Sequence, residues 1–287
     1  MPSWTGRREK YRAILEGTTC VHPASVHDAI SVRIAADLGF ELGMFAGSVA
    51  SLTVLGAPDL IVLTLTEFAE QCLRIGRAGN LPLLVDADHG YGNALNVRRT
   101  VEELETAGVS ALSIEDTELP QPFGAGGKAR LVSIEEGVGK MKAALDARQD
   151  PSLVIAGRTS AAGMTGIGDA IARAVAYEKA GVDALFMVGI RSRDELAALR
   201  AEVTLPIILA HGGDALSDRD YLAGMGVRVR LQPHLPIQVA VQAVYATMKA
   251  LHDGAPPAEI AGTAPDALMK QFRRDADYKA WAAAFLD

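Results

Sequence analysis

Two carboxylates stand two residues apart in the segment Pro-Leu-Leu-Val-Asp-Ala-Asp-His-Gly-Tyr-Gly, residues 82–92. Because strand side chains alternate between two faces, we expect Asp86 and Asp88 to project to the same side. A second apolar segment ends in Glu115 and Asp116, just before a long loop. Hard oxygen ligands of this kind suit Mg²⁺ or Mn²⁺. An isolated carboxylate pair often only caps a helix or meets solvent, but two acidic strand ends and a glycine turn together favour a metal site.

Short apolar segments that alternate with longer amphipathic ones must position these groups. The apolar segments predict strands, and helical patterns lie between most of them. The strands are predicted near residues 19–22, 41–46, 82–86, 110–115, 152–158, 183–188, 206–210 and 227–231. Eight such units predict an α/β fold, a single (β/α)₈ TIM-type barrel domain over residues 1–287. Residues 264–287 are a C-terminal helical extension, with helices predicted around 264–273 and 275–285.

Composition and charge narrow the class of protein. With 287 residues, of which 49% are hydrophobic, the chain can bury a large core, and it contains no linker-like stretch. A formal charge of −7 and the lack of long basic runs argue against nucleic acid as a partner. The pattern shows neither an export signal nor a membrane-spanning run, so we expect a cytoplasmic protein with no membrane partner. Cys20 and Cys72 lie in apolar segments and are expected to be reduced core thiols.

Polar residues and glycines follow most of the predicted strands. In barrels of this kind the chemistry collects at the carboxyl ends of the strands. The residues expected there, in strand order, are His22, Ser25, Gly47, Ser48, Asp86, Asp88, Glu115, Asp116, Arg158, Thr159, Ser160, His211, Gln232 and His234. We therefore expect an active site built from these groups.

Several sequence blocks, in this order and spacing, resemble the isocitrate lyase and phosphoenolpyruvate mutase superfamily over almost the whole chain. They are Ala-Gly-Ser-Val-Ala-Ser at 46–51, Pro58-Asp59, Asp-Ala-Asp-His-Gly-Tyr-Gly-Asn at 86–93, Ile-Glu-Asp at 114–116 and Gly-Arg-Thr at 157–159. Within the superfamily the chain is most similar to the oxaloacetate decarboxylase branch, which shares Ala-Asp-Leu-Gly-Phe at 36–40. The resemblance implies an enzyme that depends on Mg²⁺, or else on Mn²⁺, and acts on a small 2-oxo or 2-hydroxy carboxylate.

The resemblance implies a metal-binding role for four acidic residues. Asp86 would bind Mg²⁺ directly, while Asp88, Glu115 and Asp59 would hold metal-bound waters or orient the site. Asp59 follows Pro58, so it could also serve only as a helix cap.

The same resemblance implies that the segment Gly47-Ser48-Val49 and Arg158 bind the substrate. Ser48 and the backbone N–H groups of Gly47, Ser48 and Val49 would grip a carboxylate, because glycine lets backbone donors approach an anion. Arg158 would supply the counter-charge in a fork geometry that matches a carboxylate. Both features have structural alternatives, since Gly47 also suits a tight turn and the arginine could pair with nearby acidic residues as scaffold.

Two histidines are expected near the barrel mouth. His234 follows the eighth strand, where the decarboxylase branch has a substrate-binding histidine, although a lone histidine is more often structural. His211 ends the seventh strand, where the branch has a tyrosine, and Ser160 replaces an asparagine. These departures leave the substrate open. We expect His211 or a bound water to supply the last proton of the reaction.

The loop at 119–130 reads Leu-Pro-Gln-Pro-Phe-Gly-Ala-Gly-Gly-Lys-Ala-Arg. Isocitrate and methylisocitrate lyases carry a proton-donating cysteine here, and phosphonate mutases carry an Asn-Ser pair; this loop has neither. Its glycines, with Lys128 and Arg130, are typical of a mobile lid that brings positive charge over a dianion. A plain surface loop has the same composition.

These features favour decarboxylation of a 2-oxo dicarboxylate, oxaloacetate to pyruvate and CO₂, through a metal-stabilised enolate. The residues expected to act in it are Asp59, Arg158, His211 and His234. One alternative is a carbon–carbon lyase that cleaves a methylisocitrate- or alkylmalate-like 2-hydroxy acid. A second is a non-catalytic barrel that binds a carboxylate metabolite.

The C-terminal helices carry more apolar surface than a free appendage would tolerate, at Leu268, Phe272, Trp281, Phe285 and Leu286. The resemblance implies that terminal helices are exchanged between paired barrels, so we expect a homo-oligomer, a dimer or tetramer, in which 264–285 packs on a partner. Packing on its own barrel is the alternative.

Overall fold

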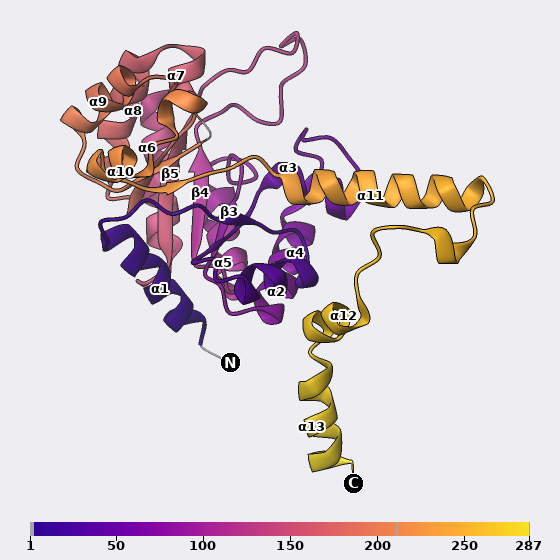
Figure 1. The fold of residues 1–287 in the computed structure, drawn as a ribbon. Coiled ribbons are helices and arrows are strands. Elements are labelled where there is room, and N and C mark those ends of the chain that lie inside the picture. The colour runs from indigo at the N-terminus through magenta and orange to yellow at the C-terminus, as the bar shows by residue number, and fades with distance from the viewer. Residues whose placement is uncertain (1–2, 211, 287) are drawn as a thin grey trace.

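Eight parallel strands form one sheet in chain order, and the sheet curls into the barrel seen in Figure 1. The structure, a computed structural model, describes residues 3–210 and 212–286. The strands are β1 (Ala24–Ser25), β2 (Gly43–Phe45), β3 (Leu83–Asp86), β4 (Ala111–Glu115), β5 (Val154–Thr159), β6 (Ala184–Met187), β7 (Ile207–Leu209) and β8 (Val227–Arg230). This topology confirms the predicted (β/α)₈ barrel.

Helices connect the strands and continue beyond the last one. They are α1 (Trp4–Glu16), α2 (Ala29–Asp37), α3 (Gly47–Ala50), α4 (Leu65–Ala78), α5 (Ala94–Thr106), α6 (Ile134–Ala147), α7 (Ala161–Met164), α8 (Ile167–Ala180), α9 (Arg193–Glu202), α10 (Arg219–Gly224), α11 (Leu235–His252), α12 (Asp266–Arg273) and α13 (Asp275–Phe285). A π-helix, η1 (Ser51–Leu55), continues α3, and two 3₁₀ turns are η2 (Asp214–Leu216) and η3 (Pro257–Glu259). In the described part of the chain, every helix is too short or too polar to cross a membrane.

The first strand differs from its prediction near 19–22. Val21 makes an isolated bridge to Val229, with backbone hydrogen bonds to Arg228 and Arg230, while Ala24 begins β1 and pairs with β2. Pro23 lies between these two pairings, and a proline has no N–H to donate to a ladder. Two separate short segments therefore pair with the neighbouring strands: Val21 with β8, which closes the ring, and β1 with β2.

Local signals set the helix starts. Asp28, Thr64, Asn93 and Ser192 each accept a hydrogen bond from a backbone N–H in the first turn of the following helix, and each is part of a capping box. Apolar side chains of the strands and of the inward helix faces fill one continuous core. Cys20 and Cys72 are buried, free thiols in this core, as predicted.

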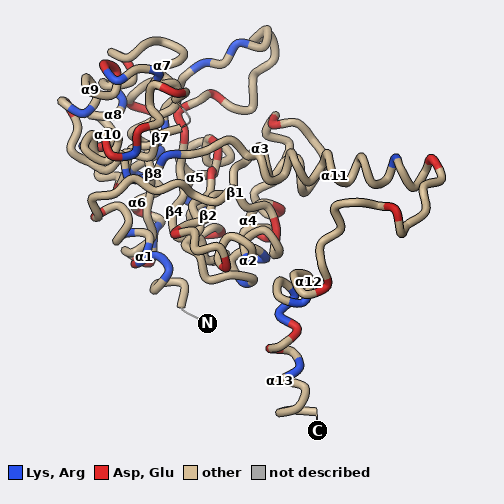
Figure 2. The backbone as a smooth tube through the Cα atoms, viewed as in Figure 1, with Lys and Arg blue, Asp and Glu red and all other residues tan. Residues whose placement is uncertain are grey.

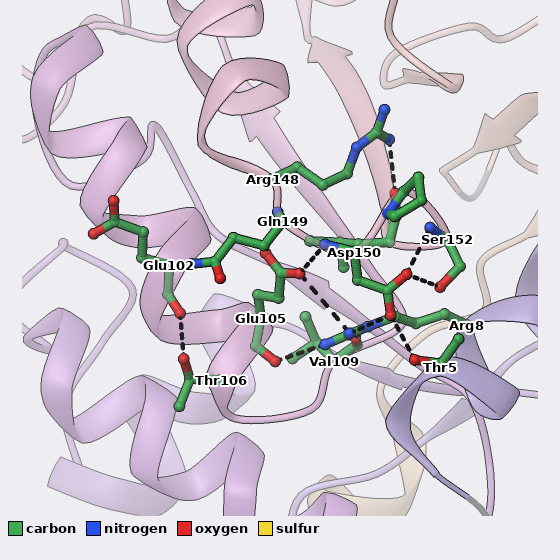
Figure 3. Close-up of polar contacts among 12 residues, drawn as sticks. Thr5, Arg8, Glu102, Glu105, Thr106, Val109, Arg148, Gln149, Asp150 and Ser152 are labelled. Atoms are coloured by element: carbon green, nitrogen blue, oxygen red, sulfur yellow. Dashed lines mark hydrogen bonds and ion pairs between the residues drawn. The ribbon is translucent and has the colours of Figure 1, made fainter.

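Helix α1 closes the floor of the barrel, below the amino ends of the strands. Arg8 of α1 is almost fully buried and binds the Asp150 carboxylate at 2.7 Å, the Glu105 carbonyl at 2.6 Å and the Val109 carbonyl at 3.0 Å. Thr5 donates to the same carboxylate at 2.8 Å. Figure 3 shows these groups converging between α1 and the ends of α5 and α6. We name Thr5, Arg8, Glu105, Asp150 and Ser152 the floor cluster.

Helix α11, the eighth barrel helix, does not cover its own barrel. It extends away from the other helices in Figure 1, and none of its residues is buried. Figure 2 shows that most of its length carries no charge. Its exposed apolar side chains are Leu235, Val239, Val241, Val244, Tyr245, Met248 and Leu251. An apolar groove of about 660 Å³, lined largely by α2 and the start of α11, lies open beside it.

The tail helices α12 and α13 match the predicted ranges and touch their own barrel. Arg274 binds both oxygens of Asp37, at 2.7 and 2.8 Å, and Gln271 donates to the same carboxylate at 2.9 Å. Arg33 of α2 donates to the Phe272 carbonyl at 2.8 Å. No described residue of the two helices is buried, and Trp281 and Phe285 stay exposed. The predicted exchange of this tail therefore stays a prediction.

Candidate active site

A cavity of about 480 Å³ opens at the carboxyl ends of β3, β4 and β5. Its charged lining is four carboxylates and one guanidinium, those of Asp59, Asp86, Asp88, Glu115 and Arg158. The remaining lining residues are Leu60, Ile61, Thr117, Leu119, Pro120, Gln121, Ala129, Ser160 and Met164. The structure thus brings together in one cavity the three residues predicted to bind metal and two of those predicted to be catalytic.

Asp86 ends β3 and faces into the barrel. Its carboxylate accepts a hydrogen bond from Ser113 Oγ at 3.1 Å and one from the Asp88 backbone N–H at 3.3 Å. Ser113 is the residue that pairs with Asp86 across β3 and β4. The other carboxylate oxygen of Asp86 is paired with Arg158 Nη1.

Arg158 links two of the carboxylates. Its Nη2 lies 3.1 Å from Glu115 Oε2, while its Nη1 pairs with Asp86. The guanidinium carbon is 5.2 Å from the centre of the Phe186 ring, a cation–π arrangement. Its buried Nε has no hydrogen-bond partner in the described structure. The sequence left two roles for this arginine, binding of a substrate carboxylate and pairing with nearby acidic residues. The structure shows the pairing.

The turn after β3 places Asp88 beside α3. Asp88 and Tyr91 both have positive φ, 48° and 58°, which residues other than glycine seldom adopt. A Cβ on Gly47 would lie 2.6 Å from Asp88 Oδ1, closer than atoms can approach. Gly47 therefore serves close approach of the α3 backbone to the Asp88 carboxylate, and a larger residue there would displace it.

Crowded carboxylates shape the electrostatics of the cavity. Burial, with the charges of Asp86, Asp59 and Glu115, raises the pKa of Asp88 to about 9. Burial likewise raises the pKa of Glu115 to about 7, although Arg158 opposes the shift. For Asp59, burial and Asp86 raise the pKa. The single guanidinium leaves the acidic groups short of positive charge.

This donor set fits a hard divalent cation. Within residues 3–210 and 212–286, three or more His, Cys, Asp or Glu side chains nowhere form a ready-made set of metal ligands. Mg²⁺, however, usually takes one or two carboxylates and keeps several waters. An open cavity with four carboxylate groups and a shortage of positive charge meets that requirement, and Asp86, at the end of β3, is the acid that both Arg158 and Ser113 contact.

Besides Arg158, which lines the cavity, the predicted substrate-binding groups lie in two places. Gly47, Ser48 and Val49 form the first turn of α3, where backbone N–H groups have no partner inside the helix. His234 precedes α11, and its Nδ1 lies 2.8 Å from Ser25 Oγ. Burial lowers the pKa of His234, against the influence of Asp86. Neither group lines the acidic cavity itself, and His211 lies outside the described residues.

Sequence reasoning missed Ser113, Phe186 and Lys140. Ser113 could have been found, because it shares a strand face with Glu115 two residues on. Phe186 looked like an ordinary strand residue, although the strand register places it beside Arg158. Lys140 has the sequence context of an exposed helix residue, yet it is buried and donates to the His89 carbonyl at 3.0 Å.

The loop at 119–130 begins and ends on a short antiparallel pairing. Thr117 bridges Leu131, and the Glu118 N–H donates to the Arg130 carbonyl at 2.8 Å. Between them the chain projects above the barrel as an irregular arm in Figure 1, with Phe123 fully exposed. Leu119, Pro120, Gln121 and Ala129 reach the cavity wall.

Residues 12–252 match the family described as phosphoenolpyruvate phosphomutase. The chain belongs to the phosphoenolpyruvate phosphomutase family. This membership confirms the resemblance on which the site residues were assigned.

Relatives match almost the whole chain. It is 60% identical over 284 residues to a protein named oxaloacetate decarboxylase from Bradyrhizobium diazoefficiens, a match that spans 99% of this chain and 98% of the relative. A protein of the same name from Rhodopseudomonas palustris (strain BisB18) is 58% identical over 284 residues, with the same coverage.

Solved structures of the superfamily superimpose closely. The 2,3-dimethylmalate lyase structure has a TM-score of 0.85 at 27% identity, with 99% of each chain covered. Phosphonopyruvate hydrolase, in a complex with oxalate and Mg²⁺, has a TM-score of 0.85 at 27% identity, with 98% and 99% covered. Oxaloacetate acetylhydrolase with 3,3-difluorooxalacetate has a TM-score of 0.86 at 25% identity, with 99% and 98% covered. The family is therefore one of enzymes that include lyases.

Proposed function

We propose that this protein is a Mg²⁺-dependent decarboxylase that converts oxaloacetate to pyruvate and CO₂. The observation that carries the proposal is the strand-end cavity, where Arg158 faces Asp59, Asp86, Asp88 and Glu115. Relatives named oxaloacetate decarboxylase, 58–60% identical over nearly full length, support the choice of substrate.

The residues of the chain would bind and orient a dicarboxylate in this cavity. Arg158 is paired with Asp86 in the structure, and we propose that it releases this carboxylate and turns to the carboxylate of the substrate. Phe186, against which the guanidinium lies, keeps it in reach during the exchange. Ser48 and the first N–H groups of α3 approach the same end through Gly47.

The reaction breaks the C3–C4 bond, releases CO₂ and leaves an enolate of pyruvate, which takes up one proton at C3. Mg²⁺, held by Asp86, would supply Lewis-acid stabilisation of the negative charge that develops on the substrate. His234 is held by a hydrogen bond between its Nδ1 and Ser25 Oγ, and we propose that its other ring nitrogen donates a hydrogen bond to the remote carboxylate. The proton donor stays a proposal, His211 or a water molecule.

We propose that the apolar wall of the cavity limits the access of water to the leaving carboxylate once the substrate is bound. Leu60, Ile61 and Met164 line it on one side, and the base of the 119–130 loop lines it on the other. We propose that this loop closes over the substrate and brings Lys128 and Arg130 towards the dianion. A less solvated carboxylate leaves as neutral CO₂ more readily, because the loss of charge is then favoured.

A turnover assay with and without metal tests the proposal. Oxaloacetate loses CO₂ slowly by itself and faster with free Mg²⁺, so the control is Mg²⁺ with heat-inactivated protein. We expect CO₂ release above this background with Mg²⁺ and none after chelation. Glyoxylate or aldehyde release from isocitrate or 2,3-dimethylmalate, at rates above CO₂ release, would contradict the decarboxylase and favour the lyase alternative.

We also propose that the protein is a homo-oligomer in which α11 is exchanged between two barrels. A helix with seven exposed apolar side chains, whose charged residue Lys249 lies in the last turn, is found beside an open apolar groove of its own barrel. This helix suits exchange better than 264–285, which touches its own α2. A Val244→Glu, Met248→Glu variant should lower the mass in solution, whereas truncation after Pro257 should not. Loss of the oligomer on truncation alone would instead favour the predicted tail exchange.

A further inference from the structure

Hydrogen bonds to its backbone carbonyl groups hold the turn that carries Asp88. The Ala87 carbonyl accepts from the Gly90 N–H at 2.9 Å, and the Asp88 carbonyl accepts from the Glu115 N–H at 2.8 Å. The next two carbonyls, of His89 and Gly90, accept from side chains instead. Four consecutive carbonyls are thus fixed, in a segment where positive φ values at Asp88 and Tyr91 would otherwise favour a different conformation.

The two side-chain donors come from helices behind the sheet. Thr100 Oγ of α5 lies 3.0 Å from the Gly90 carbonyl, and Lys140 Nζ of α6 lies 3.0 Å from the His89 carbonyl. Thr100 Oγ also reaches the Asn96 carbonyl at 3.0 Å, a bond within its own helix. Lys140 therefore makes the more specific tether between a helix and the turn.

Lys140 is unusual because a buried ammonium group binds a carbonyl. The residue is 3% exposed, and lysine is almost never buried unless it is paired with a carboxylate. Of the carboxylates whose charges act on Lys140, Glu136 on the same helix is exposed and makes no ion pair with it among the described residues. The two buried ones are already paired with arginines, Glu115 with Arg158 and Asp116 with Arg173. A buried lysine whose hydrogen bond goes to a loop carbonyl indicates that this loop must be held in one position for the site to function.

We propose that Lys140 is a positioning residue for the metal site, acting through the His89 carbonyl to hold Asp88 at the cavity. The inference rests on the proposed function, since it assumes that Mg²⁺ binds beside Asp88. Lys140 does not line the cavity and touches neither substrate nor metal. Its effect passes through one residue of backbone, from the His89 carbonyl to Asp88.

The sign of the effect separates positioning from plain electrostatics. Lys140 is positive, so removing its charge alone would make the cavity more attractive to Mg²⁺ and tighten binding. Releasing the His89 carbonyl would let the turn relax and move Asp88, which weakens binding. Removal of groups that orient metal ligands typically costs about 10- to 100-fold in metal affinity.

The experiment is a calorimetric titration of Mg²⁺ into the metal-free, full-length protein. We expect Lys140→Met to raise the Mg²⁺ dissociation constant about tenfold, in the range for groups that orient ligands. Lys142→Met, an exposed lysine on the same helix, should leave it unchanged. In turnover assays at saturating oxaloacetate, excess Mg²⁺ should restore most of the kcat of Lys140→Met. Equal or tighter Mg²⁺ binding by this variant would overturn the inference.

A second pair of variants covers the case in which Lys140→Met does not fold. Thr100→Val removes the donor to the neighbouring Gly90 carbonyl without changing charge, and we expect a smaller weakening of Mg²⁺ binding. Thr106→Val is its control, because Thr106 makes the same bond within α5, to the Glu102 carbonyl, but does not reach the turn. Equal affinities for these two would count against the tether. Failure of the parent protein to bind Mg²⁺ would overturn the proposed metal site together with this inference.

Discussion

The floor and the mouth of the barrel each hold a cluster of charged side chains, but only at the floor does each carboxylate have several hydrogen-bond donors of its own. At the floor, the Asp150 carboxylate accepts hydrogen bonds from Arg8, Thr5 and Ser152. The Glu105 carboxylate accepts hydrogen bonds from the backbone N–H groups of Gln149 and Asp150. At the mouth, Asp59, Asp86, Asp88 and Glu115 share one guanidinium. Each cluster contains buried, partly buried and exposed members, so the difference lies in the partners.

The pKa values of the acidic groups are shifted in opposite directions at the two ends. Burial alone would raise the pKa of Asp150, but hydrogen bonds from Ser152 and Arg8 hold it well below its usual range. Burial raises the pKa of Asp88 to about 9, and neighbouring carboxylates add to the shift. A cluster whose carboxylates all have hydrogen-bond donors stabilises the fold. A cluster with too little positive charge can instead bind a cation, or an anionic substrate together with a cation. The comparison predicts that variants at the two ends fail in different assays.

Removing Asp86, the proposed direct metal ligand of the mouth, should have the largest effect on turnover. We expect Asp86→Ala to reduce CO₂ release from oxaloacetate to background, because the proposed direct Mg²⁺ ligand is lost. Its thermal unfolding without Mg²⁺ should stay close to that of the parent or improve, since one crowded negative charge is gone. Near-normal turnover after thorough chelation and Mg²⁺ replacement would refute the metal assignment.

Breaking the floor cluster should have the largest effect on stability. Arg8→Met takes the guanidinium from the partly buried Asp150 carboxylate and leaves the Glu105 and Val109 carbonyls without this donor, and hydrogen bonds that involve a charged group contribute about 1.5–3 kcal/mol. Denaturant unfolding measures this loss. The dissociation constant for Mg²⁺ should stay within about twofold of the parent in the folded variant, because the floor lies at the opposite end of the strands. A weakened Mg²⁺ site with unchanged stability would reverse the roles assigned to the two clusters.

The two clusters also predict how stability depends on pH. The mouth acids have raised pKa values, about 9 for Asp88 and about 7 for Glu115, so the folded state holds more protons than the unfolded chain above pH 4. Their contribution to stability is therefore lost as pH rises towards 9. Asp150 has a lowered pKa, so its contribution is present above pH 4 and is lost only on acidification.

Unfolding in urea at pH 7 and pH 9, with EDTA or with Mg²⁺, measures this dependence. We expect the metal-free protein to be less stable at pH 9, and saturating Mg²⁺ to reduce the difference, because the cation replaces the protons. Asp88→Asn should flatten the dependence on pH. An equal difference between the two pH values with and without Mg²⁺ would contradict the shortage of positive charge at the mouth.

The mouth was more predictable from sequence than the floor, for physical reasons. Apolar strands that end in acids are visible as a pattern, so Asp86, Asp88 and Glu115 were placed correctly at one edge of the sheet. Arg8 and Lys140 lie on amphipathic helices, where a charged residue usually faces solvent, and their burial depends on what packs above them. The pairing of Ser113 with Asp86 depends on the register between β3 and β4, which the sequence pattern of either strand alone does not determine.

The end of the chain shows a different limit. The apolar residues of α11 and of the tail indicate that these helices pack against something, but periodicity does not say against which chain. The contacts of Arg274 and Gln271 with Asp37 depend on how the chain turns back after α11, and the sequence carries no signal for them.

Two matched serines provide the finest test of the comparison. Ser152 Oγ donates to Asp150 at the floor, and Ser113 Oγ donates to Asp86 at the mouth, at 3.1 Å. Each Ser→Ala change removes one hydrogen bond to a carboxylate and little volume, so the fold should survive both. For Ser152→Ala we expect a loss of about 1–2 kcal/mol in unfolding free energy and an unchanged kcat/KM. Ser113→Ala should lower kcat/KM by roughly 3- to 10-fold, the effect of about 1 kcal/mol at the proposed ligand, with little change in stability. Equal effects of the two variants in both assays would mean that the two ends of the barrel do not divide stability and chemistry between them.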